Sequence, residues 1–401
     1  MTDTITIAHL ADLHLGYSQY AYKAESGQNQ READVTRAAI ACADYVCEVL
    51  KPTIAAIAGD MFDKTRVSNY AADDGLAVCQ RFERAGIPIV VIPGNHDQSE
   101  SETAKTVLEL ARRTGAIVPL DQQTLDLNGV RFHLLPFRAI SKALGHGEDV
   151  SFDFSRELPN VLVSHAEIEG RGRDVVVARK RWLDDPHFAL VLLGHIHHGE
   201  CARDAGTGNV FYSGAVERLG FDEWHERPGL WLHTIVDGTL AKPSRRISTA
   251  DAAVQAGFAM TPRPMTQERL EAAELTDFEL NDAVDLLFAR LADKGELAGG
   301  IVKLTVKNVG ALFRQSGMEQ AWQRRFREAG GFHLEVDAQT ERMATMLDPQ
   351  IAPVGDASSG FLGYVGKQTF ADDEERERRM SIAADVMLAA REKLAAAEEV
   401  D

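Results

Sequence analysis

The chain has 401 residues, a hydrophobic fraction of 45% and a formal net charge of −18 at pH 7. This length allows two domains with a substantial core in the larger one, and the composition is that of a soluble globular protein. The negative charge argues against a protein that coats nucleic acid by bulk attraction. It is compatible with a nuclease that has acidic metal ligands and a local basic strip.

The sequence shows no signal for a membrane or for export. No apolar run approaches the roughly 20 residues that a membrane span requires. The N-terminus lacks the basic and apolar regions of a signal peptide. The 4 cysteines form no CxxC pair, which argues against a disulfide framework or a zinc knuckle. We therefore expect a cytoplasmic protein with reduced, buried thiols and no membrane association.

The first part of the chain alternates strand and helix patterns. Helical periodicity is found at residues 31–50 and again near 69–85. The expected strands are in "TITIAHLADLH", "IAAIAGD", "IPIVVIPGNHD", "VRFHLLPF", "NVLVSHAE", "LVLLGHIHH", "NVFYSGAVE" and "LWLHTIVDG". Buried apolar strands that alternate with helices indicate a layered α/β domain, with its polar loops at the carboxyl ends of the strands.

The composition changes around residues 242–264, where "KPSRRIS" and "TPRPMT" are typical of a connector. Beyond it we expect a helix from Gln267, a second helix at 279–295, a strand at 300–309, a third helix and a short strand. This order predicts a smaller α+β domain. The expected domains are residues 1–245, 246–345 and 346–401, the last being a linker and a C-terminal helix.

Metal-ligating side chains follow the apolar strands of the first domain. They are Asp12 and His14, Asp60 and Asp63, Asn95, His96 and Asp97, His165, and His195 and His197. Oxygen and nitrogen ligands of this kind suit divalent Mn, Fe or Zn. Each motif alone is common as a cap or a turn, so the prediction of a metal site depends on their joint occurrence.

The spacing of these residues indicates how they are used. Asp12 and His14 are two apart, as are His195 and His197, so each pair can point to one side of an extended backbone. Asp60 is the best candidate for a ligand shared by two metals. Two adjacent metals would suit phosphodiester hydrolysis. His96 is better placed as a proton donor or phosphate contact, with Asp97 holding its ring, and His198 is expected to be a bystander.

The ordered set "DLH…GDMFD…GNHD…H…GHIH" resembles the calcineurin-like metallophosphoesterase superfamily. More narrowly, "HLADLHLGYSQY" and "FYSGAVERLGFDE" are similar to the SbcD-type DNA double-strand-break repair nucleases. The resemblance covers about residues 5 to 237. It implies a four-layer α/β/β/α sandwich with a smaller α+β capping domain and a C-terminal helix.

The resemblance also implies two divalent metal ions, with Mn²⁺ as the expected metal. One metal would be held by Asp12, His14, Asp60 and His197, and the other by Asp60, Asn95, His165 and His195. His96 would protonate the leaving group or stabilise the transition state, oriented by Asp97. Some members have His in place of Asp63, so a phosphate-positioning role and simple support of the turn stay open for this residue.

Two basic segments are candidates for DNA contacts. A local strip near the proposed cleft contains Arg171, Arg173, Arg179, Lys180 and Arg181. In the smaller domain, Arg324, Arg325 and Arg327 would either touch phosphates or form a solvated helix face.

The resemblance implies a Mn-dependent DNA exonuclease and endonuclease that acts in double-strand-break repair with an SbcC-type SMC-like ATPase. The apolar stripe of the C-terminal helix would dock this ATPase or pack on its own body. The helix near 69–85 would contribute to a homodimer. The alternatives are a metallophosphoesterase of small phosphodiesters or phosphoproteins, and a non-catalytic regulatory subunit of the ATPase.

Overall fold

The computed structural model describes residues 4–98, 105–169, 177–178, 180–202, 208–258, 260, 262–273, 275–310, 313 and 316–340. The linker and C-terminal helix expected at 346–401 lie outside these residues. So do Arg171, Arg173 and Arg179, together with the side chain of Arg181. The described residues up to Gln339 form one compact unit, and the expected boundaries between domains remain predictions.

Two sheets form the centre of the N-terminal part. The first sheet has the order β13-β12-β1-β2-β3 and the second has the order β10-β11-β9-β6-β5-β4. The first contains β1 (Thr4–Leu10), β2 (Ile54–Ala58), β3 (Ile89–Ile92), β12 (Gly229–Val236) and β13 (Thr239–Ser248). The second contains β4 (Gln123–Leu127), β5 (Val130–Leu135), β6 (Asn160–His165), β9 (Phe188–Gly194), β10 (Glu200–Cys201) and β11 (Val210–Tyr212). The strands β1, β2 and β3 are parallel, as are β5, β6, β9 and β11.

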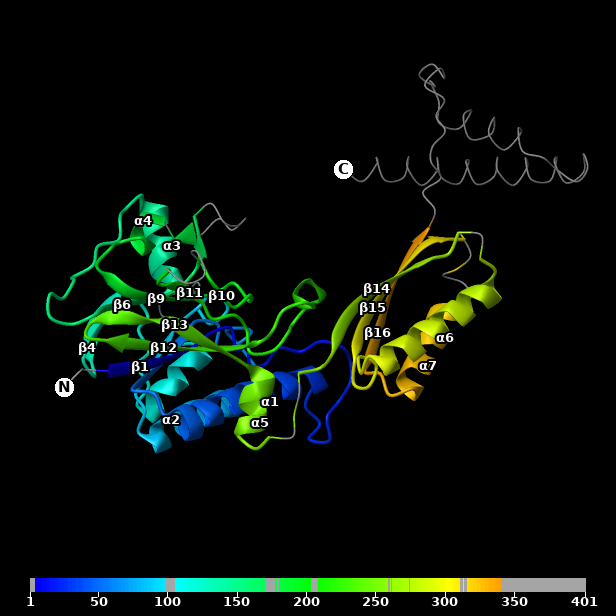
Figure 1. Ribbon diagram of the computed structural model, residues 1–401, viewed down its shortest axis with the longest axis horizontal. Helices are drawn as coiled ribbons and strands as arrows, with labels where there is room; N and C mark the ends of the chain where they lie inside the picture. Colours follow the sequence, from blue (N-terminus) through cyan, green and yellow to red (C-terminus); the bar gives the residue numbers. More distant parts are fainter. Residues whose placement is uncertain are drawn as a thin grey trace, which may run out of the picture. The chain divides into compact units, whose positions relative to one another are not determined.

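Helices cover the outer face of each sheet, so this part has four layers (Figure 1). The first sheet packs against α1 (Gln30–Asp44), the π-helix η1 (Tyr45–Leu50), α2 (Asn69–Ala85), η2 (Val107–Thr114) and α5 (Thr249–Gln255). The second sheet packs against α3 (Phe137–His146) and the short α4 (Lys180–Leu183). The expected α/β/β/α architecture is confirmed.

The strands between these layers are apolar on both faces, as strand β2 illustrates. Ala55 and Ile57 pack against the helices, whereas Ile54, Ala56 and Ala58 pack between the two sheets. Successive side chains of a strand point to opposite faces, so a strand buried on both sides reads as one continuous apolar run. This explains why the sequence predicted these strands.

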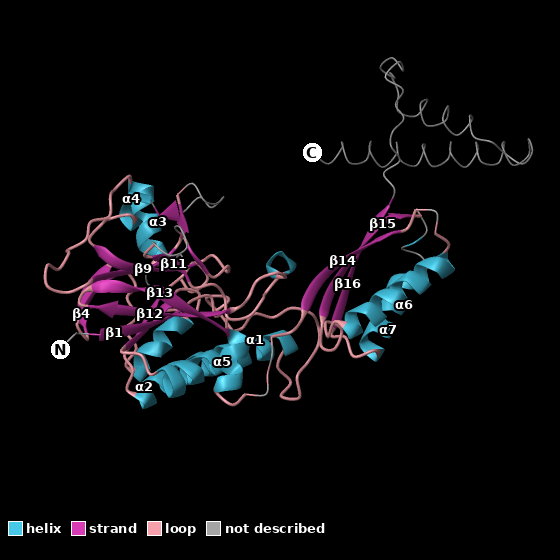
Figure 2. Cartoon of the chain, in the orientation of Figure 1, coloured by secondary structure: helices cyan, strands magenta, loops and turns pink. Residues whose placement is uncertain are grey.

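A further sheet of three strands has the order β14-β15-β16 and carries α6 (Asp277–Asp293) and α7 (Met318–Glu328) (Figure 2). Its strands are β14 (Met265–Glu271), β15 (Ile301–Val309) and β16 (His333–Thr340). Trp322 and Phe326 of α7 pack with Val284 and Leu287 of α6 in its core. The expected α+β composition is present here.

Two expectations for local structure were wrong. The segment from Gln267 is strand β14 rather than a helix, because it pairs in parallel with β15 over its whole length. Its Gln, Glu and Arg residues are good helix formers, and pairing with β15 overrides this propensity. The segment "KPSRRIS" is the end of β13 rather than a connector, since it pairs antiparallel with β12. The expected boundary after residue 245 therefore falls inside a strand.

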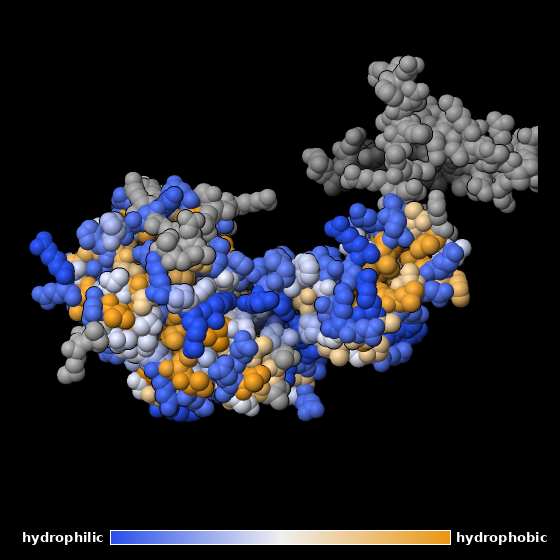
Figure 3. All heavy atoms as spheres, in the orientation of Figure 1, coloured by the Kyte–Doolittle hydropathy of each residue, from blue (hydrophilic) through white to orange (hydrophobic). Residues whose placement is uncertain are grey.

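Hydrophilic residues cover most of the face seen in Figure 3, and apolar residues gather there in separate patches. The most exposed large apolar side chains are Phe278 and Leu286 of α6, with 74% and 72% exposure. Among the described helices, none combines the length and apolarity needed to cross a bilayer.

Candidate metal centre

The candidate ligands come together where the strands of both sheets end. Asp60 follows β2 of the first sheet, and His165 ends β6 of the second. The Oδ2 atom of Asp60 lies 3.2 Å from Nε2 of His165. Parallel strands place their carboxyl ends at the same edge of a sheet, and this contact joins the edges of the two sheets. The site is therefore built from loops of both layers.

The first group of ligand atoms comes from Asp12, His14 and His197. One atom from each lies within 4.8 Å of the others. The Nε2 atoms of His14 and His197 are 3.1 Å apart. Two imidazole nitrogens at this separation need a shared proton or cation between them, because two lone pairs would repel.

The second group comes from Asp60, Asn95, His165 and His195. Oδ1 of Asn95 lies 2.9 Å from Nε2 of His165 and 3.1 Å from Nδ1 of His195. Two ligands bonded to one metal at about 2.1 Å are about 3 Å apart at a right angle. The spacing of these atoms therefore fits a single cation.

Asp60 lies between the two groups. Its Oδ2 atom is 3.9 Å from Nε2 of His14 and 3.2 Å from Nε2 of His165. Its Oδ1 atom accepts a hydrogen bond of 2.9 Å from the backbone N–H of His96. The sequence interpretation made Asp60 the shared ligand, and in the structure its Oδ2 atom lies near a histidine of each group.

The backbone is strained at four of these residues. Asp12, His14, Asp60 and His195 have φ values of 52°, 45°, 48° and 92°, in the left-handed region. Non-glycine residues adopt this region at a cost of roughly 1–3 kcal/mol each, and such residues cluster at functional sites. The conformation turns each side chain from its strand toward the shared site.

Glycines next to the ligands permit close packing. A Cβ added at Gly59 would lie 2.1 Å from Nδ1 of His165, and one at Gly94 would lie 2.1 Å from Oδ1 of Asp60. A Cβ at Gly194 would meet the carbonyl oxygen of Ala58 at 2.1 Å. These three positions have no room for a side chain, so glycine is required there.

His96, the expected proton donor, is exposed at the edge of the site. Its Nδ1 atom lies 2.7 Å from the carbonyl oxygen of Asp63. Asp97 does not hold this ring. Its buried carboxylate accepts hydrogen bonds from the backbone N–H groups of Met61, Phe62 and Gly94, at 3.0, 2.8 and 3.2 Å. Asp97 thus fixes the loops that carry Asp60 and Asn95, and the Asp63 carbonyl orients His96.

The side chain of Asp63 faces a different histidine. Its Oδ1 atom lies 3.4 Å from Nδ1 of His14, at the distance of an ion pair. Burial raises the pKa of Asp63, but His14 and Lys64 oppose this and keep it below its usual range.

Charge interactions within the cluster outweigh burial. Burial lowers the pKa of His165, yet Asp60 and Asp12 raise it to about 9. Burial would raise the pKa of Asp60, but His165 and His14 hold it below its usual range. The buried carboxylates and imidazoles of the cluster thus favour each other's charged forms. Divalent cations can replace the imidazole protons, so the charge of the donor set also fits metal binding.

Glu223, at the end of the 3-10 helix η3 (Phe221–Glu223), contacts the candidate ligand His197. The sequence interpretation did not identify this residue. Its Oε1 atom lies 2.7 Å from Nδ1 of His197. Burial lowers the pKa of His197, but the Glu223 hydrogen bond and the charge of Asp12 raise it to about 9. Neighbouring His198 is exposed and contacts Glu226 instead, consistent with a residue outside the ligand cluster.

The expected DNA contacts are only partly within the described residues. Lys180 is exposed, and its backbone N–H bonds to Glu169 at 3.2 Å. Arg325 of α7 pairs with Asp285 at 2.8 Å and with Asn281 at 2.9 Å, both on α6. The guanidinium group of Arg325 is therefore already bonded to side chains of the neighbouring helix.

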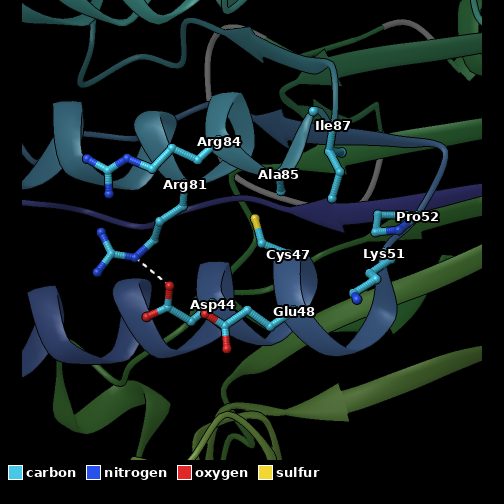
Figure 4. A pocket seen from close by; sticks show the side chains of 10 residues that line it. Asp44, Cys47, Glu48, Lys51, Pro52, Arg81, Arg84, Ala85 and Ile87 are labelled. Carbon is cyan, nitrogen blue, oxygen red and sulfur yellow. Dashed lines mark hydrogen bonds and ion pairs between the residues drawn. The ribbon is translucent and has the colours of Figure 1, made fainter.

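A pocket of about 870 Å³ lies away from these ligands, between the ends of η1 and α2. Lys51, Arg81 and Arg84 line it together with Asp44 and Glu48 (Figure 4). Arg81 is paired with Asp44 at 2.6 Å. None of the candidate ligands lines this pocket, and its mixed charges are largely balanced.

Comparison with known proteins gives a family match over the same region. Residues 5–199 match the family described as calcineurin-like phosphoesterase. The crystal structure of TT1561 of Thermus thermophilus aligns with 12% identity and a TM-score of 0.38, covering 62% of this chain and 100% of that chain. A second solved structure aligns with 10% identity and a TM-score of 0.33, with the same coverage. Both scores are too low to bear on fold or activity.

The family match spans the full set of candidate ligands, from Asp12 to His197. The structure brings these ligands together in overlapping groups that share Asp12, His14 and Asp60, and Asn95 contacts His165 and His195 beside them. Both the family match and the clustering of these side chains are typical of metal-dependent phosphoesterases. Residues 5–199 are thus similar to the calcineurin-like phosphoesterase family in sequence, and they contain the clustered candidate ligands.

Proposed function

We propose that the protein is a Mn²⁺-dependent DNA exonuclease and endonuclease that acts in double-strand-break repair. The observation that carries the phosphodiesterase part is the position of Asp60, whose Oδ2 faces both ligand groups. One metal would be held by Asp12, His14, Asp60 and His197, and the other by Asp60, Asn95, His165 and His195. When bound, two such metals activate water and neutralise charge on the phosphate.

His96 is the proposed proton donor. Its ring is exposed, and Nδ1 lies 2.7 Å from the Asp63 carbonyl, so an Nδ1–H bond leaves Nε2 directed away from this loop. As an imidazolium, the ring can give its Nε2 proton to the departing oxygen of a phosphodiester. The exposure of this side chain leaves space for a large substrate.

DNA is favoured as the substrate by two segments that resemble the repair nucleases. They contact each other beside the ligand cluster, where the hydroxyl of Tyr17 donates a 2.6 Å hydrogen bond to the carbonyl of Leu219. Leu219 in turn is bonded to Glu223, the neighbour of His197. The segments that carry the resemblance thus adjoin the site itself. The basic run around Lys180 would add phosphate contacts.

We further propose that the protein acts with an SbcC-type SMC-like ATPase as its partner. It would form a homodimer and be located in the cytoplasm. We expect residues 371–401 to dock the ATPase. Deleting these residues should abolish co-purification with the ATPase. Unchanged association of the shortened chain would reject this docking role.

The decisive assay compares linear duplex DNA with bis(p-nitrophenyl) phosphate, each with Mn²⁺ and with EDTA. We expect EDTA-sensitive degradation of DNA that is lost in Asp60→Asn. Efficient cleavage of the small diester without any DNA degradation, even with the ATPase present, would favour the small-substrate alternative. Hydrolysis of neither substrate by metal-loaded protein would favour a non-catalytic regulatory subunit.

A further inference from the structure

Glu223 contacts His197 on the side of the ring that faces away from the ligand cluster. Its Oε1 atom lies 2.7 Å from Nδ1 of His197, and Nε2 of the same ring lies 3.1 Å from Nε2 of His14. A carboxylate accepts hydrogen bonds, so Nδ1 must carry the proton in this contact. The lone pair of Nε2 is then directed toward the first metal position.

Glu223 is itself held in place. Its second oxygen, Oε2, accepts a 2.9 Å hydrogen bond from the backbone N–H of Leu219. The Leu219 carbonyl accepts the hydroxyl of Tyr17 at 2.6 Å. Both carboxylate oxygens of Glu223 are therefore used, one for the histidine and one for the loop that carries the glutamate. Its side chain is only 13% exposed, which protects these bonds from water.

The corresponding nitrogen of His165 has a weaker partner. Its Nδ1 atom lies 2.8 Å from the backbone carbonyl of Ala58, which is a neutral acceptor. A negatively charged acceptor makes an imidazole a stronger electron donor than a neutral one does. His197 is thus distinguished from His165 by the charge of its outer partner.

We propose that Glu223 is a positioning residue for the metal centre. It fixes His197 as the Nδ1–H form and directs Nε2 to the metal position formed with Asp12 and His14. This inference rests on the proposed metal centre. Glu223 itself would bind no metal. Through His197 it would raise the affinity of the first position for its metal ion.

Replacing Glu223 with Gln keeps the shape of the side chain but leaves a single acceptor oxygen. The amide oxygen can then accept a hydrogen bond from either the His197 ring or the Leu219 backbone. The NH₂ group is left facing the other N–H, which is also a donor. Loss of such an outer partner typically weakens metal binding by about 10- to 100-fold. We therefore expect Glu223→Gln to weaken the first metal position by this factor and to leave the second one intact.

Glu226 provides a matched control. It contacts His198, the neighbour of His197 in the chain, and its side chain is 14% exposed compared with 13% for Glu223. Glu226→Gln thus removes the same charge from an equally buried carboxylate whose histidine partner lies outside the cluster. It should bind Mn²⁺ as the unmodified protein does.

The experiment uses the full chain with Mn²⁺ alone. Calorimetric titration gives the affinity of each position, and electron paramagnetic resonance separates coupled metal pairs from single ions. Weakened binding and fewer coupled pairs in Glu223→Gln, with normal values in Glu226→Gln, are the expected result. Unchanged affinity in Glu223→Gln, or equal weakening in both variants, would overturn the role of Glu223. Absence of Mn²⁺ binding by the unmodified protein would instead overturn the metal centre, and the inference with it.

A measurement on the unmodified protein covers the case in which Glu223→Gln does not fold. With diamagnetic Zn²⁺ bound, nitrogen NMR of the histidines should show His197 protonated at Nδ1 and bound through Nε2. A proton on Nε2, or metal bound at Nδ1, would reject the inference. Melting temperatures of the metal-free variants serve as the folding control.

Discussion

Asp60 and His165 come from different sheets, and their side chains meet with Oδ2 and Nε2 3.2 Å apart. Asp60 also faces His14, which belongs to the other ligand group. This single carboxylate therefore links the two proposed metal positions. Removing its charge should affect both positions at once.

We expect Asp60→Asn to lose tight binding of both metals. Its hydrolytic rate should fall by more than the roughly 100-fold that the loss of an outer partner causes. Metal analysis after gel filtration and the DNA assay measure the two effects. The control is Asp126→Asn, which removes an exposed carboxylate paired with Arg131 on β4 and β5. Loss of only one metal would show that Asp60 serves a single position.

His96→Ala tests the proposed proton donor. General acid catalysis is typically worth about 10²- to 10⁴-fold, so kcat should fall by this factor while Mn²⁺ binding is retained. An atom of His96 also lies within 4.8 Å of the ligand atoms of His14 and Asp60. Loss of a metal in this variant would therefore make His96 a ligand. His198→Ala, at an exposed neighbour of the cluster, should preserve both properties.

Gly59→Ala should disrupt the site through packing. A Cβ at this residue would lie 2.1 Å from Nδ1 of His165, and φ is +94°. Gly86→Ala is the matched control, with φ of +67° and open space around the added Cβ. Backbone strain should destabilise both variants by about 1–2 kcal/mol. Gly59→Ala should lose more stability and also bind Mn²⁺ more weakly, as measured by denaturant unfolding and calorimetry. Equal behaviour of the two variants would contradict the packing argument.

The stability of the fold should depend on pH through His233. Burial lowers its pKa from 6.5 to about 3 in the folded protein. The unfolded chain takes up this proton below about pH 6.5 whereas the folded chain does not, so the free energy of unfolding falls as the pH drops from 6.5 toward 3. The slope for one such proton approaches about 1.4 kcal/mol per pH unit.

Urea unfolding in EDTA at several pH values between 4 and 7 tests this dependence. His233→Phe should reduce the slope by close to one proton relative to the unmodified protein. His187→Asn, at an exposed histidine, should leave the slope unchanged. If His233→Phe keeps the original slope, the pH dependence arises elsewhere.

Much of the fold and the clustering of the candidate ligands could be predicted because both depend on patterns that are local in the sequence. Asp60 and His195 each follow an apolar strand directly, and the parallel strands then bring the ligands together. Glu223 is 26 residues from His197 along the chain, in a loop without periodic pattern, so no spacing rule points to it. It does lie within "SGAVERLGFDE", the segment that resembles the nucleases, and this was the available signal.

The wrong predictions for Asp97 and for strand β14 also arise from contacts between segments that are distant in the sequence. Asp97 looked like a partner of His96 because the two are adjacent in the chain. Its carboxylate instead meets backbone groups of the loop after β2, a contact that depends on how the neighbouring strands are paired. Strand β14 was missed because pairing with β15 decides its conformation, and pairing between distant segments is not visible in the local composition.

Both proposed metal positions take ligands from each of the two sheets. The first needs Asp12 and His14 after β1 and also His197 after β9, and the second needs Asp60 together with His165. A partly folded chain that has formed only the first sheet holds three of the four ligands of the first position and two of the four of the second. During synthesis, His197 is the last ligand to leave the ribosome, so metal uptake has to follow the assembly of both layers. A bound metal would then report that the two sheets have docked correctly.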